Sequence, residues 1–205
     1  PISYKIKNGY TSVSLRLTPN DALFVVFLSP AKKNAVTLPV RTERRVKSIE
    51  GAWKVTFQPD RGAPPEATFE NLISYTAHTD PGIKYFSGTA TYTKSINIPV
   101  NTLMIGAQIR LDLGDVKNLA EVVVNGKPLG TLWKKPFSVD VTNVLKPGEN
   151  RLEIKVTNLW VNRLIGDQQA DMKQKITYTA IPFYNANSPL QPSGLLGPVQ
   201  LVWLK

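Results

Sequence analysis

The sequence contains no cysteine, a single histidine and no long hydrophobic run. Without cysteine, disulfides, thiolate nucleophiles and thiolate metal sites are all excluded. The longest apolar run, ALFVVFL at 22–28, has the length of a strand, far short of the roughly 20 apolar residues that a membrane-spanning helix needs. The only histidine, His78, lies in the turn-like stretch YTAHTDPG, so a histidine-dependent catalytic triad is not expected.

The first ten residues, PISYKIKNGY, also lack the basic and then apolar pattern of a signal peptide. They begin without methionine and in the middle of a strand-like pattern. We therefore expect a mature or truncated chain whose targeting signal is not in view.

The net charge of +10 raises the question of nucleic-acid binding. The basic residues are dispersed, however, and the densest groups are RTERRVK at 41–47 and two lysine pairs at 32–33 and 134–135. No recognition-helix pattern and no aromatic RNA-binding signature accompany them. We interpret the charge as a solvated basic surface, and we expect no nucleic-acid partner.

Strand patterns dominate the chain, and no segment reads as a convincing amphipathic helix. In AWKVTFQ, the residues Trp53, Val55 and Phe57 share one face, which is typical of a half-buried strand. The same alternation or a high content of β-branched residues predicts strands at 10–17, 22–28, 89–99, 103–114 and 197–204, and two more within 137–158 on either side of the turn KPGEN.

The clearest local signal is AEVVVNGKPLGTLW at 120–133, where Asn125 and Gly126 separate two apolar runs. Such a pair predicts a β-hairpin, because both turn residues take positive φ. Many short strands with closely spaced turns favour an all-β fold, a jelly-roll β-sandwich.

Two regions depart from the sandwich pattern. Residues 1–47 are too few for a domain, and we interpret them as a β segment at the end of a preceding domain, with the sandwich at 48–205. Residues 162–192 are rich in polar residues and proline, and predict a short helical turn followed by a long loop. Long loops in compact domains are often functional.

Several motifs together resemble a known family. They are WKVTF, GIKYFSGTATYTKSINIP, VVVNGKPLG, FSVDVTNVLKPGENRLEIKVTNLW and SGLLGPVQL. The chain resembles the galactose-binding-like jelly roll of bacterial glycoside hydrolases, in particular the sugar-binding domain of family 2 enzymes. The variant NLWVNRLIGD with SGLLGPV is similar to the C-terminal region of family 106 α-L-rhamnosidase-like proteins.

The resemblance implies an accessory domain of a multidomain glycoside hydrolase acting on plant-type glycans. In such enzymes the catalytic acids lie in a separate barrel, so that the isolated chain is not expected to be catalytic. The implied partners are that catalytic barrel and carbohydrate, and the implied location is the periplasm or the extracellular space. A purely structural interdomain module without a ligand is the alternative.

Candidate sugar contacts come from aromatic and planar polar side chains, which bind the faces and hydroxyls of sugars. Four candidates lie where the strand RLEIKVTN at 151–158 ends, and they are Trp160, Asn162, Arg163 and Asp167; Trp133 ends the hairpin. Alternatively, Arg163 and Asp167 pair and hold the long loop, or these side chains contact a neighbouring domain.

Two further expectations concern the rest of the chain. In GIKYF at 82–86, we expect Tyr85 and Phe86 to fill the end of the sandwich by packing. No cofactor is expected, although a structural calcium is possible around Asp112–Asp115 and Asp60.

Overall fold

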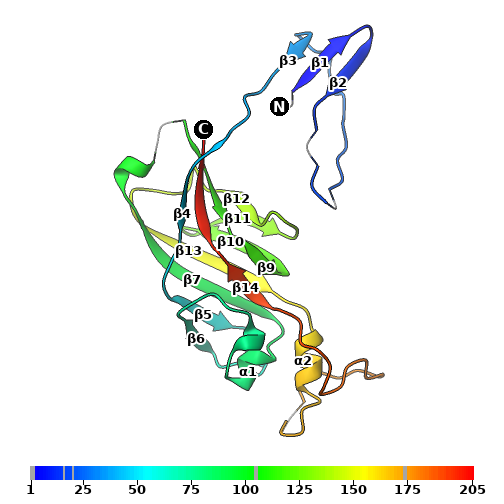
Figure 1. Cartoon of the computed structure of the whole chain (residues 1–205), viewed down its shortest axis with the longest axis vertical. Coiled ribbons are helices and arrows are strands. Elements are labelled where there is room, and N and C mark those ends of the chain that lie inside the picture. Colours follow the sequence, from blue (N-terminus) through cyan, green and yellow to red (C-terminus); the bar gives the residue numbers. More distant parts are fainter. Residues whose placement is uncertain (1–2, 16, 20, 104–105, 173–174) are drawn as a thin grey trace. The chain divides into compact units, whose positions relative to one another are not determined.

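The computed structural model describes residues 3–15, 17–19, 21–103, 106–172 and 175–205 (Figure 1). It divides into two compact units, Pro1–Thr42 and Glu43–Lys205. We call them the N-terminal unit and the sandwich unit.

The N-terminal unit contains a small antiparallel sheet in the order β2-β1-β3. Its strands are β1 (Tyr4–Lys7), β2 (Tyr10–Val13) and β3 (Ala35–Val36). Asn8 and Gly9 close the β1–β2 hairpin with φ of 52° and 79°. The strand predicted at 10–17 is therefore shorter, ending at Val13.

The strand predicted at 22–28 does not form. These residues take no regular secondary structure, and the large apolar side chains from Leu23 to Leu28 are exposed. A strand needs a partner for its backbone groups and a layer for its side chains. Among the residues that the structure describes, no strand pairs with this run, and its side chains stay largely uncovered.

The sandwich unit is built from antiparallel sheets of six, four and two strands. The orders are β11-β10-β13-β7-β5-β6, β12-β8-β15-β4 and β14-β9. The strands are β4 (Glu43–Ser48), β5 (Trp53–Phe57), β6 (Glu66–Phe69), β7 (Thr89–Ile98), β8 (Gln108–Asp112), β9 (Asp115–Lys117), β10 (Leu119–Val124), β11 (Lys127–Leu132), β12 (Ser138–Asp140), β13 (Gly148–Thr157), β14 (Gly194–Gly197) and β15 (Gln200–Leu204).

All three sheets contribute to one hydrophobic core. Val55 from the six-stranded sheet, Leu111 from the four-stranded sheet and Leu195 from the two-stranded sheet are fully buried in it. Trp203 is buried as well, and its indole N–H donates to the carbonyl of Thr102 over 2.8 Å. The predicted all-β sandwich is confirmed.

In β5 the alternating pattern predicted correctly which side chains face the core. Trp53, Val55 and Phe57 are buried on β5, while Lys54 between them is exposed. The long pair β7–β13 runs in unbroken register from Thr89↔Thr157 to Ile98↔Gly148.

The hairpin predicted at Asn125–Gly126 joins β10 to β11, with φ of 52° and 78°. Asn125 also binds across the structure, since its Nδ2 donates to Asn150 Oδ1 over 2.8 Å. The amide of Arg151 donates to Asn125 Oδ1 over 3.0 Å. The turn residues thus fix the hairpin and tie it to the start of β13.

The border between the two units lies between Thr42 and Glu43, whereas the sequence placed it after residue 47. The reason is that β4 pairs with β15 along its length, from Ser48↔Gln200 to Glu43↔Leu204. The charged run RTERRVK therefore enters a sandwich strand, although its side chains are exposed.

The sandwich unit has two short α-helices, α1 (Pro81–Lys84) and α2 (Val161–Gly166), among the residues described. Two single turns of 3-10 helix, η1 (Tyr75–Ala77) and η2 (Val100–Thr102), accompany them. Figure 1 shows α1 and α2 at the same end of the sandwich, where β13 leads into α2.

Candidate functional site

Helix α2 carries two of the five predicted site residues, Asn162 and Arg163, and is followed by a third, Asp167, at the start of the long loop. Its first polar side chain, Asn162, is buried and bonds the end of that loop. Asn162 Oδ1 accepts from the amide of Gln191 over 2.8 Å, and Nδ2 donates to the Gln191 carbonyl over 2.7 Å. The Asn162 side chain therefore holds the end of the loop in place.

Arg163 on α2 and Asp167, the residue just after the helix, form a buried ion pair. The Nε–Oδ1 distance is 2.9 Å, and both side chains are 1% exposed. The second oxygen, Asp167 Oδ2, accepts from the amides of Ile176 and Thr177 over 3.1 and 2.7 Å, and from the Thr177 hydroxyl over 2.6 Å. The pair thus holds the loop, as the alternative reading of these two residues has it.

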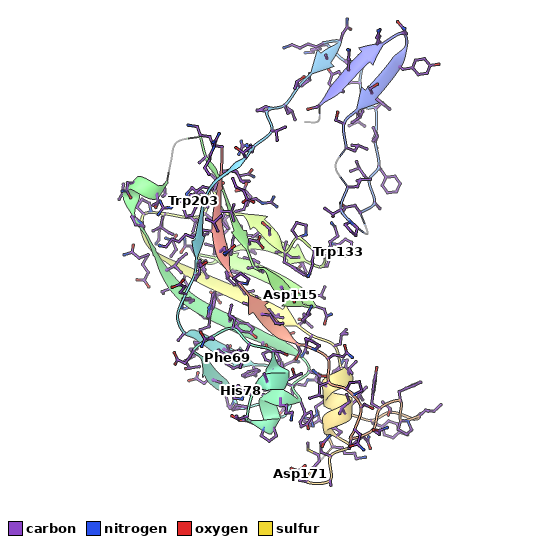
Figure 2. The ribbon with its side chains drawn as sticks, in the orientation of Figure 1. Phe69, His78, Asp115, Trp133, Asp171 and Trp203 are labelled. Atoms are coloured by element: carbon purple, nitrogen blue, oxygen red, sulfur yellow. The ribbon has the colours of Figure 1, made fainter. Side chains whose placement is uncertain are left out.

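The two tryptophans are accessible, with Trp160 45% exposed and Trp133 65% exposed. Trp160 is the residue just before α2, and the Arg61 guanidinium lies 4.8 Å from its ring centroid. Trp133 follows β11, and Figure 2 shows it well apart from Asp171 in the loop after α2. Whether these side chains contact a sugar or a neighbouring domain stays a prediction.

A cavity of about 580 Å³ lies beside α1 and α2, and we call it the Tyr85 cavity. It is lined by Gly62, Thr79, Pro81, Gly82, Lys84, Tyr85, Arg163, Gln169, Asp171, Met172 and Ile176. Arg163 is the one residue of the predicted set in this lining.

Close packing around α2 shapes the wall of the Tyr85 cavity. The Arg163 guanidinium carbon lies 6.0 Å from the centroid of the Tyr85 ring. A Cβ at Gly166 would lie 2.6 Å from Arg163 Nη2 and 2.6 Å from Tyr85 Cβ. Glycine at this position is therefore what lets the arginine and the tyrosine approach the helix.

The sequence analysis did not propose Lys84, Gln169 or Asp171 as candidate binding residues, and it assigned Tyr85 a packing role. Phe86 is fully buried in the core as expected, but Tyr85 is half-buried and faces the cavity. The sequence did contain a signal for α1, because Asp80 followed by Pro81 is a typical start of a helix. In the structure, Asp80 Oδ1 accepts from the amide of Gly82 over 2.7 Å and caps this helix.

Two acidic side chains of the sandwich unit, Asp140 and Asp112, make structural contacts. Asp140 Oδ1 accepts from the Thr142 hydroxyl over 2.6 Å, and Asp112 Oδ1 accepts from the Gly114 amide over 3.0 Å. His78 stacks on Phe69 with ring centroids 5.4 Å apart (Figure 2). These contacts give the carboxylates and the imidazole scaffold roles.

The turn considered for calcium does not fit that ion. Lys117 and Lys135 lie 3.0 and 3.3 Å from the Asp115 carboxylate. Partial burial opposes the charge of Asp115, yet hydrogen bonds and attraction from both lysines lower its pKa. Two ammonium groups already neutralise this carboxylate. In the described part of the chain, no cluster of three or more His, Cys, Asp or Glu residues could hold a metal.

Residues 75–187, more than half of the chain, match the family described as "Glycosyl hydrolase 2 galactose-binding domain-like". The chain belongs to this family. The resemblance drawn from the hairpin and strand motifs is thereby confirmed. The matched region of this galactose-binding-like domain includes α1, α2 and most of the lining of the Tyr85 cavity.

Two relatives are much longer than this galactose-binding-like chain. A solved rhamnosidase of Novosphingobium sp. PP1Y is 48% identical, with a TM-score of 0.92 over 99% of this chain and 19% of its own. A protein of Formosa agariphila named "Putative beta-glucuronidase" is 41% identical over 75% of this chain and 15% of its own. The chain therefore spans less than a fifth of either relative.

A solved β-glucuronidase of Ruminococcus gnavus shares the fold alone. It is 20% identical, with a TM-score of 0.58 over 82% of this chain and 31% of its own. Among the described residues, no helix is both long and apolar enough to span a membrane.

Proposed function

We propose that this chain is a non-catalytic, carbohydrate-binding domain of a multidomain glycoside hydrolase, and that it takes a sugar in the Tyr85 cavity. The observation that carries the proposal is the cavity itself. Its volume of about 580 Å³ is that of a small-molecule site, and it lies in the region matched to the family.

The lining of the cavity suits a sugar. The Tyr85 ring offers an apolar wall for C–H groups, Lys84 offers donors for hydroxyls, and Asp171 and Gln169 Oε1 offer acceptors. The Lys84 ammonium lies 5.5 Å from the Tyr85 ring centroid, so charge and aromatic surface occur together. Trp160 stays a candidate contact outside this lining.

For the parent enzyme we propose an α-L-rhamnosidase acting on plant-type glycans, as the resemblance to family 106 implies. Its support is the 48% identity to the Novosphingobium rhamnosidase over nearly the whole chain. The proposed partner is a catalytic barrel of the same polypeptide, and the proposed location is the periplasm or the extracellular space.

Calorimetric titration with rhamnose- and galactose-containing oligosaccharides tests the sugar site. We expect saturable binding that Asp171→Ala weakens at least fivefold, because this exposed side chain lines the cavity and its loss cannot disturb the core. Trp133→Ala is the matched control and should leave the affinity unchanged. Binding that depends on Trp160 or Trp133 instead would move the site.

The alternative function is a purely structural interdomain module. The specific observation in its favour is that Asn162, Arg163 and Asp167 are all buried and hold the loop 168–192. If no heat of binding is seen at millimolar sugar, the structural role is the better account of this end of the molecule.

A further inference from the structure

The apolar segment 22–28 is a surface that an isolated protein would rarely leave open. Phe24 and Leu28 are each 90% exposed, and every residue from Leu23 to Leu28 exposes more than two fifths of its surface. The run ALFVVFLSPA at 22–31 contains no charged residue. Exposed strand-like segments are normally protected by charges, proline or a cover, since they otherwise aggregate.

The geometry points to a strand that lacks its sheet. Side chains at even positions and at odd positions are both exposed, so the segment is apolar on both of its faces. Such a pattern is typical of a strand buried on both sides inside a larger sheet. Among the described residues, no strand pairs with 22–28 and no backbone hydrogen bond joins it to another segment.

A groove beside the segment supplies part of a layer for one face. It has a volume of about 450 Å³ within the N-terminal unit. The lining consists of Tyr4, Ile6, Thr11, Val13 and residues 25–31. Val25 faces it and is the least exposed of the run, at 46%. The hairpin β1–β2 therefore covers one side only in part and leaves the other side open.

We propose that the apolar segment 22–28 adds as a strand to the edge of a β-sheet in the flanking polypeptide of the parent enzyme. The inference rests on the proposed function, because it requires that parent. The Novosphingobium rhamnosidase matches 99% of this chain and yet is only 19% covered by it, so a relative with the same unit has extensive further surface in its own polypeptide. Strand addition would satisfy the backbone groups and bury both faces at once.

Hydrogen–deuterium exchange tests the proposal on two proteins, this 205-residue chain and the full-length gene product. In the chain alone, the amides of residues 23–28 should exchange near the rates of unstructured peptides. In the full-length protein they should exchange at least a hundredfold more slowly. Equal, fast exchange in both proteins would overturn the proposal.

A charged variant distinguishes docking from general stabilisation. Phe24→Lys should leave thermal unfolding of the isolated chain unchanged, because its ring is 90% exposed. In the full-length protein it should reduce the protection of residues 23–28 at least tenfold. Tyr10→Lys, at another exposed position of the N-terminal unit, is the matched control and should not reduce it.

Two other outcomes separate this inference from its alternatives. Protection in the isolated chain that grows with concentration, together with a dimer in sedimentation, would identify a second copy as the occupant and overturn the proposal. Protection in a full-length protein without glycosidase activity would keep the docking and reject the proposed function. Sugar binding without protection of residues 23–28 would keep the proposed function and reject the docking.

Discussion

Buried polar side chains at the α2 end hold the loop 168–192 in position. Asp167 meets Arg163 with one oxygen and three donors of the loop 168–192 with the other. A buried charge is tolerated only when such partners replace its water shell. Replacing such a residue should therefore lower the stability of the sandwich unit and release the loop at the same time.

Asp167→Ala should destabilise the sandwich unit by about 3–5 kcal/mol, because it leaves the Arg163 charge buried without its partner. Denaturant unfolding measures the loss, and hydrogen exchange at residues 175–177 should rise with it. Glu66→Ala, which breaks the exposed pair between Glu66 and Lys54, is the control and should cost less than about 1 kcal/mol. Equal losses in both variants would contradict the prediction.

Two buried tyrosines should make stability sensitive to alkaline pH. Burial raises the pKa of Tyr75 and of Tyr92. The unfolded chain releases these protons above about pH 10, while the folded state keeps them. Stability from this source is thus complete below about pH 10 and falls as the pH rises above it.

Tyr75→Phe should flatten that alkaline loss, as followed by urea unfolding between pH 8 and 11. Tyr75 Oη has no hydrogen-bond partner among the described residues, so the variant should be nearly neutral at pH 7. Tyr92→Phe should instead cost about 1–3 kcal/mol at pH 7, since Tyr92 Oη accepts from the amide of Leu195 over 3.1 Å. An unchanged alkaline slope in Tyr75→Phe would exclude this tyrosine as a source.

Among the elements, the turns hold strands in register by side-chain bonds to backbone. Asn150 is fully buried at the start of β13. Its Oδ1 accepts from the Lys146 amide over 2.9 Å, and its Nδ2 donates to the carbonyls of Lys146 and Gly148 over 2.7 and 2.9 Å. Together with Asn125 it links the β10–β11 hairpin to the turn before β13.

Asn150→Ala should lower the free energy of unfolding by about 1–3 kcal/mol, because several buried backbone groups lose their partners together. Thermal unfolding measures the loss, and amide exchange should rise in both turns that Asn150 joins. Gln200→Ala serves as a control, since its side chain makes a surface contact with Ser48. A loss confined to one turn would mean that Asn150 does not couple the two.

At the scale of the whole molecule, the division between Thr42 and Glu43 predicts that the sandwich unit folds without the N-terminal unit. Its hydrophobic core is drawn entirely from residues 53–203. Residues 43–205 alone should therefore unfold cooperatively, with a midpoint within about 3 °C of the full chain. Calorimetry checks the midpoint, and light scattering should show less aggregation without the apolar segment 22–28. A piece that begins at residue 49 is the comparison, and it should be less stable because it lacks β4.

The sequence alone determined the strands whose pattern is local. Trp53, Val55 and Phe57 alternate with polar residues, and Asn125–Gly126 takes positive φ wherever it occurs between such runs. Family motifs added the sandwich type. Trp53 was assigned to the apolar face of its strand from periodicity, and it is buried in the core.

Only the tertiary structure shows which candidate side chains are buried and which line a cavity. In the sequence, Arg163 and Asp167 look the same whether they bind a sugar or pair with each other. The structure shows that they pair, with both side chains 1% exposed. The Tyr85 cavity joins α1 to the loop after α2, a contact over about 80 residues that no local pattern contains. The segment 22–28 reads as a strand but forms none here, because a strand is completed by a partner and not by its own residues.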